Sequence, residues 1–443
     1  MVSEAEFTER MAETGLYEGQ PHVGVAVSGG GDSMALVLLA ETWCRARQGR
    51  LTALIVDHRL RPGSSDEAQR VAGWLTARGV DSVILEWRHG GGEPIAGGLQ
   101  QRARAARYHL MENWCRANGV LHLLLGHTRD DQAETYLMRL EKGSGPDGLA
   151  AMSRVRETAA CRIVRPLLGV SRAALRVWLT GLGQPWIDDP SNLDPRFRRT
   201  EIRKLFEDGT FDAAALAASA ARYEAARQVL DDAAAELLAR ACKLAPAGYA
   251  ELDLARLKDA PEDLALRCLG RVIAAVGGGG YPPRRRAVET MLGDLRSVVG
   301  LRRTLGGCLL AVHGETVLIC REARNLPEPV TVSPGVRHLW DGRFLCDFDT
   351  VTGTDGRPKM AALGRRGWRQ MIGDRPEIGD NVASLRDALP TLPALFDDHG
   401  VFSVPHLGYR RGADAYVSAR DCGFSEIRFA PRNSLVGVGF AVA

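Results

Sequence analysis

The sequence has no apolar stretch that approaches the roughly 20 residues a membrane-spanning helix needs. Residues 1–20 are rich in Glu and contain no apolar core, so they do not resemble a signal peptide. Hydrophobic residues make up 45% of the chain and charged residues 25%, which is ordinary for a soluble globular protein. These features predict a cytoplasmic protein that does not act on a membrane.

Paired cysteine motifs are missing as well. The nine cysteines are scattered and no two form a C-x-x-C. This spacing argues against a zinc ribbon and against a dithiol redox centre. In a cytosolic chain we expect the thiols to be reduced and mostly buried.

Lysine is scarce, at only five of the 57 basic residues, and the formal net charge is +3. The net charge therefore does not indicate a polyanionic binding partner. Arginine suits phosphate binding and base stacking, but an arginine excess can equally reflect genomic composition. Composition alone leaves that choice open.

The 443 residues should form two or three domains. From residue 21, short apolar runs alternate with amphipathic ones, which predicts an α/β fold with a doubly wound parallel sheet. The expected strands are Val23–Val27, Leu51–Val56, Ser82–Trp87, Leu121–Gly126 and Arg162–Leu168. The expected helices between and after them are Ser33–Arg45, Ser65–Arg78, Leu99–Asn118 and Asp130–Leu140.

The remaining sequence predicts a different organisation. Phe211–Lys243 contains neither Pro nor Gly and should form one long helix. We expect a catalytic domain over 1–210, this linker helix over 211–244, a mostly helical domain over 245–330 and a small mixed α+β domain over 335–443.

One glycine-rich loop carries most of the chemical information. It follows the first expected strand and opens the first expected helix, and it reads Ser28, Gly29, Gly30, Gly31, Asp32, Ser33. Glycines let backbone N–H groups close on an anion, and the helix N-terminus adds the positive end of its dipole. The Walker A pattern occurs nowhere in the chain. The alternative is a tight turn in which Ser33 caps the helix.

This loop matches the S-G-G-x-D-S motif of the PP-loop ATP pyrophosphatase superfamily. The resemblance implies that ATP is cleaved between its α and β phosphates and that an oxygen of the substrate is adenylated. A carboxylate beside a polyphosphate needs a bridging divalent cation, so Mg²⁺ on Asp32 is implied.

Two further motifs narrow the resemblance to lysidine synthetases. Asp57 and His58 lie in a V-D-H-x-L-R-x-x-S-x-x-E-A signature, which in the family forms part of the nucleotide pocket. The usual glycine of that signature is replaced by Arg59. Arg104 and Arg107 match the A-R-x-x-R-Y helix, in which Arg107 corresponds to an active-site arginine. By pattern alone, His58 could be an ordinary loop residue and both arginines could be solvated.

The last two motifs lie at the ends of later strands. His127 and Asp131 belong to G-H-x-x-D-D-Q-x-E-T, where Thr128 and Asp131 can also form a capping box. Arg165 opens R-P-L-L, residues 189–192 read D-P-S-N, and Arg199 and Arg203 fit R-N-x-x-R with Thr200 in place of asparagine. Several arginines close together are suited to binding phosphate.

The resemblance to lysidine synthetases implies ATP, L-lysine and a tRNA(Ile) with a CAU anticodon as partners, and it leaves a homodimer open. The cytidine O2 would attack the α-phosphate of ATP, and the lysine amine would then displace AMP from C2. We expect the catalytic residues to be Asp32, His127, Asp131, Arg107 and Arg199.

Two rival functions remain at this point. A PP-loop tRNA thiolase would need a cysteine pair or an iron–sulfur site near the pocket, and Cys115 and Cys161 lack such spacing. A nucleotide-sensing RNA-binding module that has lost catalysis is the second rival, although the intact glycine loop and Asp131 argue against it.

Overall fold

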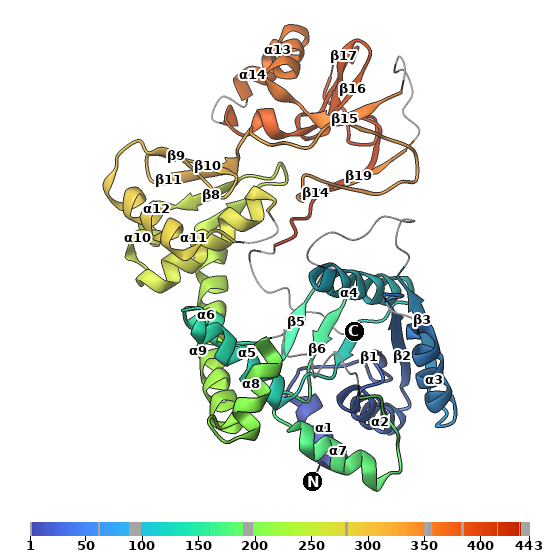
Figure 1. The fold of residues 1–443 in the computed structure, drawn as a ribbon. Coiled ribbons are helices and arrows are strands. Elements are labelled where there is room, and N and C mark those ends of the chain that lie inside the picture. The colour runs from blue at the N-terminus through green and yellow to red at the C-terminus, as the bar shows by residue number, and fades with distance from the viewer. Residues whose placement is uncertain are drawn as a thin grey trace. The chain divides into compact units, whose positions relative to one another are not determined.

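A computed structural model describes most of the chain. The described residues are 2–60, 63–87, 99–158, 160–188, 198–279, 282–349, 354, 357–381, 385–413, 415–433 and 435. Contacts divide the chain into two compact units, one from Met1 to Gln228 and one from Val229 to Gly437 (Figure 1). The finer division into four segments stays a prediction.

The first unit is built on a six-stranded sheet in the order β3-β2-β1-β4-β6-β5. Its strands are β1 (His22–Val27), β2 (Arg50–Asp57), β3 (Asp81–Glu86), β4 (His122–Leu125), β5 (Val155–Glu157) and β6 (Arg162–Val164). All neighbouring pairs are parallel except β5 with β6. The predicted α/β fold with a parallel sheet is confirmed. Strand β5 is an antiparallel edge strand, and its three residues are too few to form a recognisable strand pattern in the sequence.

Helices cover both faces of this sheet, as expected for near-continuously apolar strands. The helices of this unit are α1 (Glu4–Ala12), α2 (Gly31–Arg45), α3 (Ser64–Thr76), α4 (Leu99–Ala117), α5 (Arg129–Glu141), α6 (Pro146–Leu149), α7 (Arg172–Gly181) and α8 (Arg198–Glu207). Strand β4 shows the division: Leu124 belongs to the core cluster with α2 and α7, whereas Leu123 and Leu125 join the cluster with α4.

The strand order reverses between β1 and β4, which pair in parallel with Val25 opposite Leu124. Strands β2 and β3 continue to one side of this point, and β6 and β5 to the other. In open α/β sheets, ligands bind beyond the carboxyl ends of the strands at such a switch point. The loops after β1 and β4, which hold the glycine loop and the His127 motif, therefore border the expected binding crevice.

The second unit begins within α9 (Ala213–Ala241), so the long helix predicted for this region is confirmed. It contains three antiparallel sheets, in the orders β7-β8-β11-β10-β9, β12-β15-β16-β17-β18 and β13-β14-β19. The first sheet consists of β7 (Cys242–Leu244), β8 (Ala250–Asp253), β9 (Arg302–Leu305), β10 (Cys308–His313) and β11 (Thr316–Arg321), packed with α10 (Leu254–Asp259), α11 (Glu262–Gly277) and α12 (Arg285–Ser297).

The other two sheets belong to the C-terminal part of this unit. They contain β12 (Val330–Thr331), β13 (His338–Trp340), β14 (Phe344–Phe348), β15 (Lys359–Ala362), β16 (Pro393–Asp397), β17 (Gly400–Val404), β18 (Tyr409–Arg410) and β19 (Phe424–Phe429). Two helices, α13 (Gly364–Asp374) and α14 (Pro376–Asn381), lie in the same part of the chain. None of the helices in the described ranges is long and apolar enough to cross a membrane.

A buried ion network joins the two parts of the second unit. Asp341 accepts hydrogen bonds from Nε of Arg321 (3.1 Å) and from Nε of Arg343 (2.7 Å), and all three side chains are almost fully buried. Arg343 also donates to the carbonyls of Gly248 and Thr391. One carboxylate is therefore shared by two guanidinium groups, and backbone carbonyls accept further hydrogen bonds from both.

We predict that Asp341→Asn destabilises the second unit by about 3–5 kcal/mol, because it leaves two buried arginines without a counter-ion. Asparagine tolerates the left-handed backbone of this position (φ 51°), so the change isolates the charge. Denaturant unfolding would measure the loss. Asp347→Asn, which breaks the exposed pair with Arg337, should cost about 1 kcal/mol or less. Equal losses in the two variants would contradict the prediction.

Candidate active site

The glycine loop is closed by its own hydroxyl groups. Ser33 Oγ donates to the carbonyl of Gly30 (2.9 Å) and accepts the N–H of Ser28 (3.2 Å). The N-cap of α2 is Gly30, with no side-chain capping bond, so the alternative in which Ser33 caps the helix is wrong. The first-turn N–H groups of a helix have no partner within it. An uncapped start of this kind offers them to an anion.

Close contacts explain two glycines at this end of the sheet. Gly29 has a φ of 86°, and a Cβ there would lie 2.6 Å from Val71 Cγ2. A Cβ on Gly126, just after β4, would lie 3.1 Å from the carbonyl oxygen of Asp32. Gly29 is thus confined by the Val71 side chain of α3, and the end of β4 lies too close to the first turn of α2 for a side chain at Gly126.

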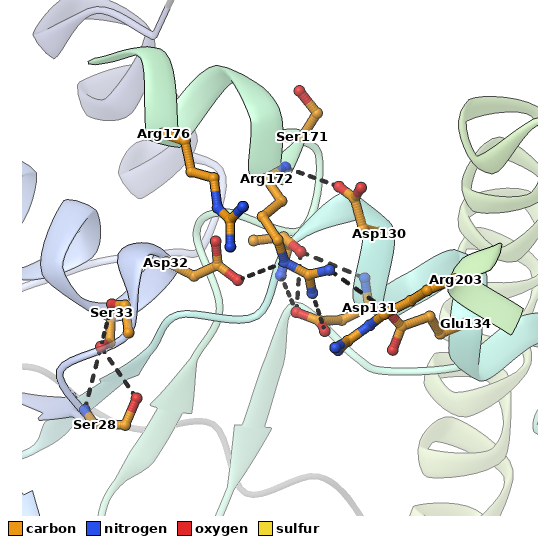
Figure 2. Close-up of polar contacts among 12 residues, drawn as sticks. Ser28, Asp32, Ser33, Asp130, Asp131, Glu134, Ser171, Arg172, Arg176 and Arg203 are labelled. Atoms are coloured by element: carbon orange, nitrogen blue, oxygen red, sulfur yellow. Dashed lines mark hydrogen bonds and ion pairs between the residues drawn. The ribbon is translucent and has the colours of Figure 1, made fainter. Parts of the chain in front are cut away.

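Three carboxylates converge on one guanidinium beside the loop (Figure 2). Arg172, the first residue of α7, donates from Nε to Asp32 Oδ2 (3.1 Å) and from Nη2 to Asp131 Oδ1 (3.0 Å). Its Nη1 lies 3.7 Å from Glu134 Oε1. Residues from α2, α5 and α7 therefore share one charge centre, which brings Asp32 and Asp131 together as the sequence led us to expect.

The same centre is fixed from two further directions. The backbone N–H of Arg172 donates to Asp130 Oδ2 (2.9 Å), which fixes the start of α7 to α5. On α8, Arg203 Nε donates to Glu134 Oε1 (2.7 Å), and Arg199 Nε lies 3.9 Å from the other oxygen. Glu134 is almost fully buried and is held by arginines from two helices.

Burial and mutual repulsion act on these carboxylates. Burial raises the pKa of Asp32, the Arg172 guanidinium opposes that rise, and the nearby Asp131 adds to it. Burial also raises the pKa of Glu134, against the opposing hydrogen bond from Arg203. Burial disfavours the charged form of Arg172, but the three carboxylates outweigh it and raise its pKa. The cluster is therefore a cation site that Arg172 fills.

Asp131 has two roles at once. It forms a capping box with Thr128, in which its Oδ2 accepts the Thr128 N–H (2.8 Å) and Thr128 Oγ1 accepts the Asp131 N–H (3.4 Å). Its Oδ1 accepts from Arg172. The capping box expected from the sequence is therefore confirmed, and the same residue contacts Arg172, while its catalytic role stays a prediction.

His127 belongs to a second, positively charged group. Burial, together with the nearby Arg165, Arg104 and Arg107 and against the opposing charge of Asp131, lowers its pKa to about 3. Its Nδ1 is buried and has no hydrogen-bond partner in the described structure. Burial also lowers the pKa of Arg107. A neutral imidazole surrounded by guanidinium groups is suited to binding an anion.

Asp57 and His58 lie at the carboxyl end of β2. Asp57 accepts hydrogen bonds from Ser64 Oγ (2.8 Å), Ser65 Oγ (2.6 Å) and the Arg59 N–H (3.0 Å). Burial disfavours its charged form, but these hydrogen bonds outweigh burial and lower the pKa of Asp57. Its carboxylate thus holds the turn that presents His58.

Arg59 has a φ of 50°, in the left-handed region that a glycine enters without strain. The resemblance gives glycine as the usual residue here, and this backbone angle is a physical reason for it. The Arg59 side chain pairs with Glu86 Oε1 on β3 (2.7 Å). That contact partly offsets the cost of the backbone conformation.

Sequence reasoning missed Arg172, the residue at the centre of the cluster. Its signal was weak: Ser171 as a helix N-cap, shortly after the last parallel strand, with an arginine next to it. The D-P-S-N segment at 189–192 lies outside the described residues.

The donor set at Asp32 fits a magnesium ion that binds mainly to phosphate. Asp32 Oδ1 is buried and has no hydrogen-bond partner, so one carboxylate oxygen remains for a cation. Mg²⁺ typically takes one or two carboxylates together with phosphates and water. No group of three metal-ligating side chains occurs within the described residues. These residues cannot bind the ion with protein ligands alone, and a bound polyphosphate would have to supply the others.

We predict that His127 weakens the fold in acid. Its pKa is about 3 in the folded chain and 6.5 normally, so the unfolded chain binds the proton first. Stability should fall as the pH drops from 6.5 toward 3. The free energy of unfolding at pH 7 and at about pH 5 should therefore differ less in His127→Gln than in the wild type. The exposed His109→Gln is the control, and an unchanged pH dependence in His127→Gln would contradict the assignment.

Comparison with known proteins agrees with this geometry. The PP-loop domain family profile matches residues 2–208. A tRNA(Ile)-lysidine synthase of Ruegeria pomeroyi is 40% identical, over 91% of this chain and 93% of the relative. One from Wolbachia pipientis is 32% identical, over 92% and 94%.

A solved U34-tRNA thiolase from Methanococcus maripaludis, with its [4Fe-4S] cluster, shares 16% identity. The match covers 50% of this chain and 78% of the thiolase chain, with a TM-score of 0.43. The full-length relatives and the PP-loop profile decide the matter: this chain is an enzyme of the PP-loop ATP pyrophosphatase class and belongs to the tRNA(Ile)-lysidine synthase family.

Proposed function

We propose that the enzyme joins L-lysine to C2 of the first-anticodon cytidine of a tRNA(Ile) with a CAU anticodon. ATP is consumed, the cytidine is adenylated, and lysidine, AMP and pyrophosphate are the products. Membership of the family supports the reaction. The structural observation that supports the reaction is that the uncapped start of α2, a candidate anion site, lies beside the carboxylate cluster around Arg172, a candidate cation site.

The anion site is the uncapped start of α2. The glycine loop presents N–H groups there, and Ser28 and Ser33 add hydroxyls. We assign the departing pyrophosphate of ATP to this loop. Asp32 would hold Mg²⁺, which lowers the repulsion between phosphate and carboxylate when it is bound.

The cation site is the carboxylate cluster around Arg172. A lysine amine carries the same positive charge as that guanidinium and needs the same acceptors. Glu134 Oε2 is buried and has no hydrogen-bond partner in the described structure, and its only ion contact is Arg199 at 3.9 Å. We assign the lysine side chain to the edge of this cluster, close enough to the loop to meet an adenylated base.

The reaction needs the cytidine to leave its stack before O2 can reach the α-phosphate. Arg107 and Arg199 are our candidates for stabilising the phosphate charge that develops. The lysine amine must lose a proton to attack C2. His127 and Asp131 are our two candidates for the base; the lowered pKa of His127 makes it the weaker one, and Asp131, whose Oδ1 accepts a hydrogen bond from Arg172, is favoured.

Other parts of the proposal rest on the family alone. We assign tRNA holding to residues 245–330 and nucleotide binding to the turn at Asp57 and His58. We place the reaction in the cytoplasm, and a homodimer stays a prediction.

The thiolase alternative is not favoured. Cys115 and Cys161 are fully buried in the core between α4 and β6, where their thiols hydrogen-bond to each other. All nine cysteines are free, and eight of them are buried. The full-length relatives are named lysidine synthases.

We predict that Asp32→Ala and Asp131→Ala each lower labelled-lysine incorporation into tRNA(Ile) by about 100-fold, because each removes a charge partner of the reacting groups. Asp81→Ala, at the amino end of β3 on the opposite edge of the sheet, is the matched control. Near-wild-type incorporation in the first two variants would contradict the roles assigned to Asp32 and Asp131.

A second prediction tests the lysine site. Glu134→Gln should raise the KM for lysine at least about tenfold, because it removes a charged acceptor, with a smaller effect on the KM for ATP. Initial rates at varied lysine and ATP would measure both constants. AMP and pyrophosphate release with and without lysine would separate a ligase from a thiolase and from an inactive RNA-binding module. Equal changes in the two KM values would contradict the lysine assignment.

A further inference from the structure

Arg176 lies over the glycine loop without belonging to any motif that the sequence revealed. It follows Arg172 by four residues on α7, so both side chains leave the same face of the helix. A Cβ on Gly31 would lie 3.8 Å from Arg176 Cγ. Figure 2 shows both arginines extending from α7 toward the loop.

The two arginines are engaged very differently. Arg172 is held by three partly or fully buried carboxylates. Arg176 instead pairs with Asp188 at 2.8 Å, and the two side chains are 49% and 70% exposed. Exposed ion pairs contribute little to stability. The Arg176 guanidinium can therefore exchange Asp188 for another anion at small cost.

The segment that carries Asp188 is itself attached to the loop. The N–H of Ile187 donates to the carbonyl of Gly29 (2.9 Å), and the Trp186 ring lies 3.7 Å from a Cβ built on Gly31. Asp188 is thus held at the edge of the anion site. It is a carboxylate placed where it competes with phosphate for the same guanidinium.

A polyphosphate at this loop also needs a cation that the carboxylates do not already hold. Arg172, Arg199 and Arg203 all face Glu134 or its neighbours. Arg176 differs from these three arginines because it lies against Gly31 of the loop and its partner Asp188 is exposed. Guanidinium forms strong, often bidentate, hydrogen bonds with phosphate oxygens.

We propose that Arg176 binds the β and γ phosphates of ATP and then the pyrophosphate product, and that Asp188 competes with them for its guanidinium. This rests on the proposed function for the presence of ATP and extends it to a residue outside the recognised motifs. The two partners of one ion pair then act in opposite directions. Removing Arg176 weakens pyrophosphate binding, and neutralising Asp188 strengthens it.

The test is calorimetric binding of pyrophosphate in magnesium-containing buffer, without tRNA or lysine. Arg176→Gln should weaken binding about tenfold or more, through the loss of a charge-assisted hydrogen bond. Asp188→Asn should tighten it by about threefold. Arg45→Gln, which breaks an exposed ion pair with Glu41 at the far end of α2, should leave binding unchanged.

A purely structural ion pair would behave differently, because both variants would then weaken binding together. That result, or unchanged binding in Arg176→Gln with wild-type thermal stability, overturns the proposal. So does a wild-type protein that binds no pyrophosphate. If the opposite shifts are found but no lysidine forms, the Arg176 assignment holds and the proposed ligase reaction is the part that fails.

Discussion

The arrangement of side chains at the carboxyl ends of the strands in the first unit depends on one guanidinium group, that of Arg172. Asp32, Asp131 and Glu134 come from two helices that begin at neighbouring strand ends, and three carboxylates this close repel one another. Arg172 offsets that repulsion and at the same time fixes α7 against α2 and α5. Without a cation there, burial would push these acids toward their neutral forms. The carboxylates beside the glycine loop would then lose the negative charge on which the proposed lysine site depends.

The sequence was informative where a motif is local and uninformative where the contact is distant. The glycine loop could be predicted because its strand, turn and helix start occupy about a dozen adjacent residues, whose types report their backbone conformation. The parallel sheet could be predicted because strands covered on both faces are continuously apolar. Arg172 could not, since it lies 140 residues from Asp32 and only the packing of α7 on α2 brings them together. The hydrogen bonds from Ser64 and Ser65 to Asp57 could not be predicted either. In sequence, an aspartate that stabilises a turn cannot be distinguished from one that binds a ligand.

The abundance of arginine has a partly structural explanation. On α12 and β9, Arg285, Arg302 and Arg303 each pair with an acidic side chain of the same unit. Arg321 and Arg343 share the buried Asp341. Many arginines of the second unit therefore form ion pairs with acidic side chains of the same unit. These arginines do not form an unpaired positive surface for RNA. A basic segment in the sequence indicates an RNA-binding surface only where its charges are left without such partners.

Asp131 shows how closely local and tertiary structure are joined in this fold. One of its oxygens completes the capping box that starts α5, and the other accepts from Arg172. Removing this side chain therefore loosens a helix start and unbalances the charge cluster together. Glu134, one turn further along α5, has no capping role, and its ion pairs within the described residues are with Arg172, Arg199 and Arg203. The chemistry of the cluster is consequently best isolated at Glu134, because a change there alters the charge and leaves the backbone that positions it in place.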